Sequence, residues 1–442
     1  MNLFRQARHA LKFEVSLELA TPLLLRSGQT GDVTDSSIER TFDGRLHING
    51  YVWASLLRRT LARLADGRDL AETVGKYEDK GGLSPLWCEA GVADLHATAV
   101  NPGIAVDRMY GATKRGALFN DELAIAGLQL TLRFTVFTPD EAAAQRWRKA
   151  LLEALKLIDE GIENIGGGWT YGYGRLSVGR IAGVTLDLKQ PEGRKLLWQW
   201  DGIDWQEEFL PETIECTTPS TIIDVDARVA PGQLLAVKSQ VFPIDAPAFG
   251  KLPDSFVFRR NRRIGDEIKQ KPVIPGKAIR QALLSVPLER KWRSAPKNGE
   301  PDICLSTTHD RQRPKEERCA CRRCRWFGST DAAGVIAVTD APVTNFSTEV
   351  ISRVQLCEHS MQNMNLFNGE YLSAGDFSFK IIIDHGRAEN SDELIMEIRD
   401  LLEEMRGENA PPGWYRLGGT ATCTGQVQVT GFTITGGLSH ER

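Results

Sequence analysis

The chain of 442 residues lacks long hydrophobic runs. No stretch approaches eighteen uninterrupted apolar residues, the length that a membrane-spanning helix requires. Residues 1–5 do not begin an apolar segment with a small-residue cleavage site, as an export signal would. We therefore expect a cytoplasmic protein with no membrane partner. In such a protein the eight cysteines are not expected to form a disulfide framework.

The motifs of several common enzyme classes are also missing. No Gly-Lys-Ser/Thr closes a glycine-rich stretch, which excludes a Walker A phosphate loop. The glycine-rich stretches follow expected helices, whereas a dinucleotide-binding fold places them before a helix. No Gly-x-Ser-x-Gly elbow or Ser/His/Asp order is visible, and only seven histidines occur.

Charge is distributed unevenly along a chain whose net charge is only −4. Residues 255–325 hold 19 Lys and Arg against 8 Asp and Glu, a net charge of +11, so the remainder carries −15. Such asymmetry favours a polyanionic partner such as nucleic acid. A basic loop that is simply solvated is the competing interpretation.

Two segments that lie 219 positions apart have similar residues. Asp35 to Arg40 reads DSSIER, and Asp254 to Arg259 reads DSFVFR. Each is followed by a short extended run and a helix with a basic face. The repeat predicts two copies of one domain, each with an aspartate in the same context.

Both halves are expected to contain strand, helix, strands, helix, glycine-rich loop and strand in that order. The expected elements are 12–20, 51–64, 128–137, 141–160 and 166–174 in the first half, and 222–237, 277–286, 377–384, 391–405 and 418–425 in the second. This is the βαββαβ order of ferredoxin-like, or RRM-like, folds. We predict an α+β protein with two tandem ferredoxin-like domains, 1–205 and 206–442, and a linker near 190–215.

Four of the eight cysteines are crowded into one segment: Cys304, Cys319, Cys321 and Cys324. Thiolates bind Zn²⁺ tetrahedrally, and four cysteine ligands are typical of a closed, structural site. We expect structural Zn²⁺ in an insertion over about 290–330, with His309 as an alternative to Cys304. Three arginines alternate with the ligands and are expected on an RNA-facing surface: Arg322, Arg323 and Arg325.

The run GGGWTYGYGRL at 166–176 resembles the C-terminal glycine-rich loop of the RAMP superfamily of CRISPR proteins. The run KPVIPGKAIR at 271–280 resembles the phosphate-contacting helix start of their backbone subunits, and VDRMYGAT at 106–113 resembles the run that builds their thumb hairpin. The resemblance covers both halves. It is greatest to a fusion of two backbone subunits of a type III CRISPR effector complex, with III-D as a candidate subtype.

The resemblance implies a subunit that binds a CRISPR guide RNA and complementary target RNA and assembles with other effector subunits. Each domain is expected to carry an inserted thumb hairpin, which in the second copy we place at 351–354. The residues expected to contact RNA are Arg58, Arg59, Arg108, Lys277, Arg280, Arg353 and the loop glycines Gly167, Gly168, Gly418 and Gly419.

The resemblance also implies chemistry, because an aspartate in this loop of the family cleaves target RNA with a divalent metal. Carried over by position, the catalytic residues are Asp35 and Asp254, with Mg²⁺ or Mn²⁺ as the cofactor. A carboxylate could hold the metal near the scissile phosphate while the neighbouring 2′-OH attacks. The expected activity is an endoribonuclease that cuts target RNA at two sites. Rival carboxylates in the first copy are Asp32, Glu39 and Asp43.

Three other functions remain open from the residues. Aspartate commonly forms turns, so the chain could be a guide-RNA scaffold whose target is cut by other subunits. His47 lies before the first basic helix and could act as general acid or base in guide processing. Outside the superfamily, the chain could be a zinc-ribbon binding protein whose repeat has no catalytic meaning.

Overall fold

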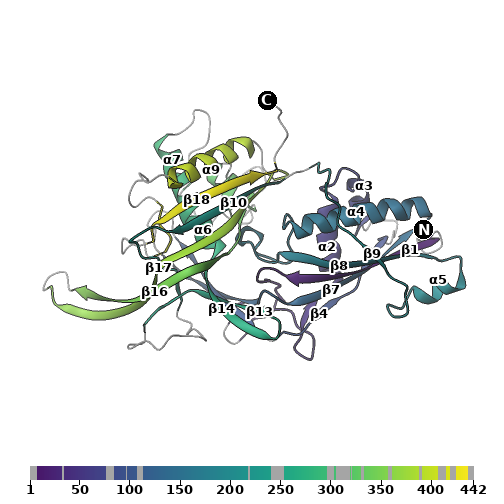
Figure 1. Cartoon of the computed structure of the whole chain (residues 1–442), viewed down its shortest axis with the longest axis horizontal. Helices are drawn as coiled ribbons and strands as arrows, with labels where there is room; N and C mark the ends of the chain where they lie inside the picture. Colours follow the sequence, from purple (N-terminus) through teal and green to yellow (C-terminus); the bar gives the residue numbers. More distant parts are fainter. Residues whose placement is uncertain are drawn as a thin grey trace. The chain divides into compact units, whose positions relative to one another are not determined.

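The computed structural model describes residues 7–31, 34–75, 84–95, 97–106, 113–217, 220–239, 253–295, 303–304, 319, 321–329, 333–356, 361–387, 391–406, 415–418 and 425–436. These residues form a mixed α+β structure (Figure 1). Within these ranges, no helix is both long enough and apolar enough to cross a membrane.

The chain divides into two compact units. The first comprises Met1–Gly103, Leu118–Trp169 and Tyr173–Pro219, and the second comprises Ile104–Ala117, Thr170–Gly172 and Ser220–Arg442. The second main segment therefore starts after the predicted boundary at 205/206. The reason is that β9 (Gln206–Glu208) pairs with β8 (Leu176–Asp187) and so extends the sheet of the first unit.

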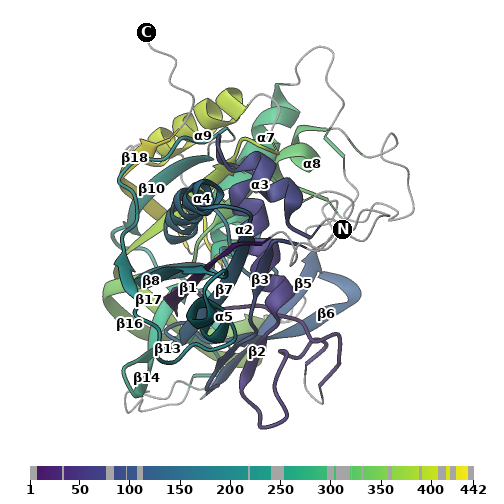
Figure 2. The same ribbon diagram turned by 90° about the vertical axis from the view of Figure 1, so that its right-hand side faces the viewer.

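The first unit is built on an antiparallel sheet in the order β3-β7-β1-β8-β9. Its central strand is β1 (His9–Leu19), which pairs with β7 (Gln129–Thr138) on one side and β8 on the other. The strand β3 (Leu86–Cys88) pairs with β7. Helices α2, α3 and α4 lie on the same side of this sheet (Figure 2). Their bounds are Gly50–Leu61, Arg68–Thr73 and Glu141–Asp159.

The helix α4 begins and packs as its sequence predicts. The Asp140 carboxylate accepts a hydrogen bond from the Ala143 N–H at 2.8 Å, which satisfies one of the unpaired amides of the first turn. The four residues expected on its apolar face are all buried: Trp147, Leu151, Leu155 and Ile158. Burial of each such side chain contributes about 1.5–3 kcal/mol, so this face holds the helix on the sheet.

The second unit has its own sheet, in the order β13-β14-β16-β17-β10-β18. The strand β10 (Ser220–Val229) lies next to the edge of this sheet and pairs with β17 (Asn363–Asp384) and β18 (Val427–Thr435). The strand β15 (Ile336–Val338) pairs with β17, and α9 (Ser391–Arg406) packs on β18. In both units, therefore, the first strand lies between the strands that precede and follow the last long helix.

The strands β1 and β10 share an irregularity. The pairing of β1 with β8 shifts register between Val15 and Leu17, and the pairing of β10 with β18 shifts between Asp226 and Ala227. A bulge of this kind bends the strand and increases its twist. Each unit thus carries a bulge between its first strand and its last long strand.

The helix expected over 277–286 continues beyond Pro287, so the prediction that it ends there is wrong. It consists of α6 (Gly276–Ile279), a π-helical turn (Arg280–Ser285) and α7 (Val286–Ser294). Pro287 lies in the first turn of α7, where a missing N–H is tolerated. The wide π-helical turn separates this proline from the preceding α-helix.

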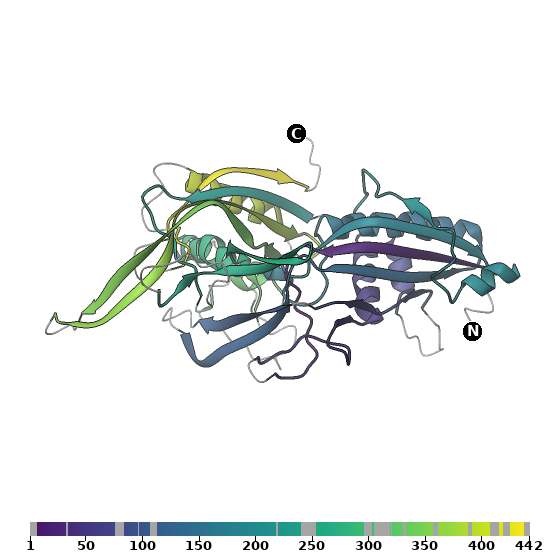
Figure 3. The same ribbon diagram turned by 60° about the horizontal axis from the view of Figure 1, so that its bottom comes forward.

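Two hairpins extend the strand content of the chain. The strand β5 (Thr98–Val106) pairs with β6 (Thr113–Ala124), and the thumb run predicted at 106–113 lies between them, mostly outside the described residues. The strand β16 (Ala341–Leu356) pairs with β17, and the distal part of this hairpin projects beyond the other strands of its sheet (Figure 3). The second predicted thumb, 351–354, lies on β16.

The remaining elements are short. They are β2 (Leu46–Ile48), β4 (Gly91–Ala93), η1 (Trp169–Tyr171), α5 (Pro191–Leu196), β11 (Lys238–Ser239), β12 (Phe256–Val257), β13 (Arg259–Ile264), β14 (Glu267–Ile274) and α8 (Arg322–Phe327). Of these, β2 pairs with β4, β11 with β12, and β13 with β14.

Candidate functional site

The first predicted catalytic aspartate, Asp35, lies in a loop that runs beside β6. Its N–H donates to the carbonyl oxygen of Asn120 at 2.9 Å, and its carboxylate Oδ2 accepts from the Asn120 N–H at 2.7 Å. The next residue, Ser36, forms a parallel bridge with Asp121. Asp35 is exposed, so its carboxylate is fixed at one oxygen and still accessible to a ligand.

The second predicted catalytic aspartate, Asp254, makes the same contacts in the second unit. Its N–H donates to the carbonyl oxygen of Asn368 at 2.7 Å, and its Oδ2 accepts from the Asn368 N–H at 2.7 Å. Ser255 forms a parallel bridge with Gly369. Asp254 is also exposed. The two aspartates of the sequence repeat are therefore equivalent in their hydrogen bonding.

A glutamate two residues after each asparagine completes both loops. Glu122 accepts from the Ile38 N–H at 3.0 Å and from both terminal nitrogens of Arg40, at 3.0 and 2.6 Å. In the second unit, Glu370 is the equivalent residue. It accepts from the Val257 N–H at 2.9 Å and from both terminal nitrogens of Arg259, at 2.8 and 2.7 Å. These bidentate pairs fix the end of each aspartate loop.

The two glutamates have lowered pKa values for the same reason. Burial alone would raise the pKa of Glu122 and of Glu370. The hydrogen bonds donated by Arg40 and by Arg259, together with the backbone N–H contacts, outweigh burial and hold each pKa below its ordinary value. Both carboxylates are thus charged and paired at neutral pH.

These asparagines and glutamates were not predicted, although the sequence contains a signal for them. Residues 119–122 read FNDE and residues 367–370 read FNGE, a second repeat that matches the repeat of the aspartates. The asparagine holds the aspartate, and the glutamate holds the arginine at the end of the loop. A search for paired short motifs in both halves would have found it.

The rival carboxylates of the first loop have other partners or lie outside the described residues. Glu39 contacts the Nδ1 atom of His47 at 3.0 Å. His47 therefore pairs with a residue that lies close to it in the sequence. Asp43 forms an ion pair with Arg45 at 2.7 Å. Asp32 lies outside the described residues. Glu39 and Asp43 thus belong to local side-chain pairs, unlike Asp35.

The arginines predicted to contact RNA from the first basic helix differ in accessibility. Arg58 is exposed in the last turn of α2. Arg59 instead donates to Glu163 at 3.0 Å and to the Asn164 carbonyl at 2.8 Å. Arg63, which is buried, donates to the same glutamate at 2.8 Å. Arg59 therefore links α2 to the start of the glycine-rich loop.

In the second unit, Arg280 does not lie on a surface, which corrects the prediction that it contacts RNA. Its guanidinium is buried and donates to the carbonyl oxygens of Ile336 at 3.1 Å and Phe327 at 2.6 Å. Burial lowers its pKa to about 10. Lys277 lies half-buried near the start of α6. The helix start itself is occupied, because the Gly276 N–H donates to the Asp340 carboxylate at 2.8 Å.

The predicted RNA-contacting glycines shape the loops by close backbone approach. Gly167 donates its N–H to the Leu24 carbonyl at 2.8 Å. Gly418 has a φ of +62°, and a Cβ there would lie 2.0 Å from the Ala236 carbonyl oxygen, so no other residue fits without strain. Gly168 has a φ of +75°. Gly419 lies outside the described residues.

The two predicted thumbs are described to different extents. Arg108 lies outside the described residues. Arg353 is on β16, with its guanidinium 5.0 Å from the ring centroid of Tyr371. Apolar side chains are exposed along this part of the hairpin: Val350, Val354, Met364, Leu366 and Phe367. Val354 and Leu366 pair on one face of the hairpin, whereas Phe367 pairs with Arg353 on the other. Exposed apolar side chains that lie together commonly mark an interaction site.

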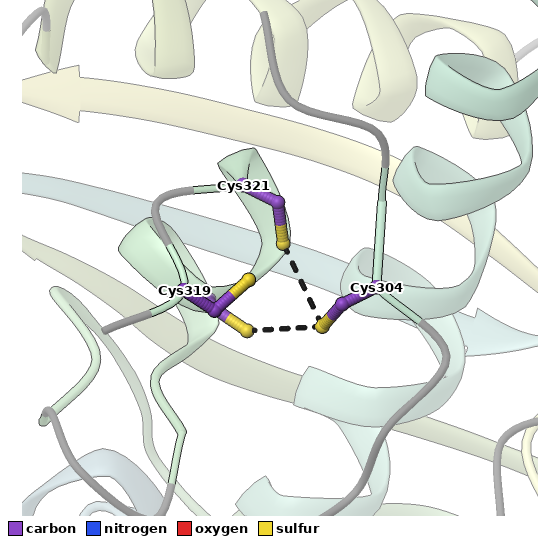
Figure 4. A group of neighbouring side chains, drawn as sticks. Cys304, Cys319 and Cys321 are labelled. Carbon is purple, nitrogen blue, oxygen red and sulfur yellow. Dashed lines mark hydrogen bonds between the residues drawn. The ribbon is translucent and has the colours of Figure 1, made fainter. Parts of the chain in front are cut away.

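The four clustered cysteines come together in the second unit. All their sulfur atoms lie within 4.8 Å of one another, and the Sγ atom of Cys304 lies 3.3 Å from that of Cys324 and 3.8 Å from that of Cys321. The labelled side chains point toward one another (Figure 4). Tetrahedral Zn²⁺ with Zn–S distances of about 2.3 Å places its ligands roughly 3.8 Å apart, so the four residues could hold a metal such as zinc.

The pKa of Cys321 is lowered, whereas burial raises the pKa of Cys319 and the hydrogen bond with Cys321 raises that of Cys324. A hydrogen bond from Cys324 lowers the pKa of Cys321 to about 4, which supplies one thiolate. His309, the alternative ligand, lies outside the described residues. Arg322 is buried and pairs with Glu393 of α9 at 3.0 Å.

Arg323 is also largely buried and pairs with Glu289 of α7 at 2.9 Å. The prediction that Arg322 and Arg323 face RNA is therefore wrong. Both arginines connect α8 to neighbouring helices.

Residues 16–177 match the RAMP superfamily. The RAMP match includes Asp35, Asn120 and the glycine-rich loop, and it ends before β10 begins at Ser220. RAMP proteins are in general CRISPR-associated and bind RNA. No curated protein matches the chain.

Proposed function

We propose that this chain is a backbone subunit of a type III CRISPR effector complex that binds guide RNA and cleaves complementary target RNA at two places. The observation that carries this proposal is the repeated loop. Asp35 and Asp254 are exposed, and each is held by one asparagine through the same two hydrogen bonds. A repeated site suits a periodic partner, and a guide paired with its target is such a partner.

The proposal includes two tandem ferredoxin-like domains. The RAMP match covers most of the first unit, and RAMP domains are in general ferredoxin-like. The neighbour order β3-β7-β1-β8 in the first unit corresponds to β15-β17-β10-β18 in the second. Both orders follow from a βαββαβ chain. Duplication would explain why the two aspartates, asparagines and glutamates recur with the same contacts.

The aspartate loops suit a role beside a phosphate group. In each, Oδ2 is held by an asparagine N–H, which orients the carboxylate and leaves it exposed. Mg²⁺ is commonly bound by one or two carboxylates together with substrate phosphates, so Asp35 and Asp254 could each supply one ligand. Bound there, Mg²⁺ or Mn²⁺ would neutralise charge at the scissile phosphate. A neighbouring 2′-OH as nucleophile would restrict cleavage to RNA.

Other residues support binding rather than chemistry. The exposed Arg58, the half-buried Lys277 and Arg353 remain candidates for phosphate contacts, and the exposed apolar side chains of the β16–β17 hairpin could lie against bases. The metal held by the four cysteines would be structural. Such a complex would act in the cytoplasm with other effector subunits.

A non-catalytic scaffold is the competing function, and one observation favours it. The bond from asparagine N–H to Asp35 or Asp254 is what a purely structural turn would also need. The RAMP match does not distinguish the two, because only some RAMP proteins cleave RNA. The two functions differ in whether negative charge at these positions is required.

Substitution by asparagine separates them. In Asp35→Asn and Asp254→Asn the side-chain oxygen can still accept the N–H bond, but the charge is lost. The complex is assembled with guide RNA, each variant and the double variant, and cuts are mapped in a labelled complementary RNA. We expect each single variant to slow one cut by about 100-fold or more and the double variant to slow both, with target binding unchanged.

Asp35→Ala and Asp254→Ala serve as matched controls that also remove the turn contact. If the asparagine variants cut normally while the alanine variants do not, the aspartates are turn residues. If the double asparagine variant retains both cuts, the chain is a scaffold and other subunits cleave.

A further inference from the structure

The second unit carries a basic hairpin that its counterpart in the first unit lacks. In the first unit, Arg40 bridges Leu46 across a tight turn at 41–45. In the second unit the equivalent arginine, Arg259, begins a six-pair ladder of β13 and β14 that closes at Gly265, where φ is +63°. The RAMP match at 16–177 does not include this hairpin.

The register of this hairpin places like charges opposite one another. Residues opposite each other in an antiparallel ladder lie on the same face, and the faces alternate along the strand. Arg260 pairs with Lys271 and Arg262 pairs with Lys269, so four cations share one face. Like charges directly opposite each other are destabilising, and the protein nevertheless has two such pairs in succession.

The carboxylates printed beside this face lie at its base and near its turn: Asp340 and Glu267. Arg260 forms a buried ion pair with Asp340 at 2.6 Å. Lys269 contacts Glu267 at 3.1 Å, and both side chains are more than half exposed, so solvent weakens this pair. Arg262 and Lys271 are exposed. The face therefore presents a row of accessible cations at the outer part of the hairpin and a fixed pair at its base.

The base of the hairpin is joined to the start of the basic helix. The Asp340 carboxylate accepts from the Arg260 Nε at 2.6 Å with one oxygen and from the Gly276 N–H at 2.8 Å with the other. The next residue of that helix is Lys277. The cations of the hairpin thus lie on an element that is fixed to α6, from which we have proposed an RNA contact.

We infer that the face formed by Arg262, Lys269 and Lys271 binds the ribose–phosphate backbone of single-stranded RNA. This inference rests on the proposed function and adds a binding site that only the second unit has. A row of cations at every second residue, about 6.7 Å apart along the strand, matches a ligand with regularly repeated negative charge. Binding would release counterions from the RNA.

The test uses the full chain and a labelled single-stranded RNA of about 40 nucleotides, with affinity measured by fluorescence anisotropy at several salt concentrations. The variant is Arg262→Thr/Lys269→Thr/Lys271→Thr, because threonine favours strands and removes repulsion within the hairpin. Three lost phosphate contacts should lower the slope of log Kd against log salt by about 2. Affinity at low salt should fall by about tenfold or more.

A matched control removes the same charge from an exposed site in the first unit, Lys189→Gln/Arg194→Gln/Lys195→Gln, and should keep the wild-type slope. The charge-preserving variant Arg262→Lys/Lys269→Arg/Lys271→Arg should bind like wild type. If the threonine variant keeps the wild-type slope and affinity, the hairpin does not bind RNA, and an acidic protein becomes its expected partner. If the wild-type chain binds no RNA, the proposed function fails as well.

Discussion

Glu122 and Glu370 occupy equivalent positions but differ in how deeply they are buried. The Glu370 side chain is fully buried and its partner Arg259 is 12% exposed, whereas Glu122 is 12% exposed and Arg40 is 34% exposed. A partly solvated ion pair contributes little to stability. Removing one partner of a buried pair costs more, because the other charge is left buried without a counter-charge. The Glu–Arg pair should therefore contribute more to the free energy of unfolding in the second unit than in the first.

At the residue scale we predict that Glu370→Gln destabilises the protein by about 3 kcal/mol, because it leaves the Arg259 guanidinium buried without a counter-charge. Glu122→Gln should cost about 1 kcal/mol. The free energy of unfolding in urea measures both values. Equal costs for the two variants would contradict the burial argument.

The lowered pKa of Glu370 gives the same substitution a pH signature. A carboxyl group whose folded pKa lies below its unfolded value of about 4.3 stabilises the protein above that value. This stabilisation is lost as the pH falls through the folded pKa. Stability of the wild type should accordingly decline below about pH 4, and that of Glu370→Gln should decline less steeply over the same range.

At the scale of elements, α8 depends on its surroundings because it has only six residues. A helix of this length is not stable alone. Cys321 and Cys324 place it in the cysteine cluster, Arg322 pairs it with α9, and Trp326 packs edge-on against Trp292 of α7 with ring centroids 5.2 Å apart. The Arg322 and Trp326 contacts thus join α8 to two longer helices.

We predict that purified protein contains about one zinc atom per chain, measured by elemental analysis. Removal of the metal with a chelator, or the substitution Cys321→Ser, should lower the unfolding temperature and change the near-ultraviolet circular dichroism, because Trp326 loses its fixed surroundings. Cys216→Ser, outside the cluster, should leave the zinc content unchanged. Protein that contains no metal and is indifferent to chelation would argue against the site.

At the scale of the whole molecule, the two aspartate loops predict two independent cuts. In the proposed complex, position along the guide selects each cut, because base pairing and not the protein reads the sequence. The number of nucleotides between the two cuts should therefore stay constant when guide and target are changed together. Sequencing of the cleavage products for several guide–target pairs measures this distance. A spacing that varies with base sequence would contradict selection by position.

The sequence by itself determined much of the protein at the local level. The periodicity of α4 and its Asp140 cap, the clustered cysteines, and the paired contexts of Asp35 and Asp254 could all be recognised from neighbouring residues. These features depend on contacts within a few positions or on repetition, both of which are visible in a linear chain. The match of 16–177 to the RAMP superfamily agrees with the resemblance of the glycine-rich run at 166–176 to that superfamily.

Only the tertiary structure decided which charged residues are accessible. Arg280, Arg322 and Arg323 have the same residue type as Arg58 and Arg262, yet the first three are buried against carbonyl oxygens or glutamates far along the chain. Likewise, Asp35 and Asp254 are held by asparagines on distant strands. Charge and repetition are properties of the linear chain, whereas burial and pairing depend on how remote strands and helices pack together.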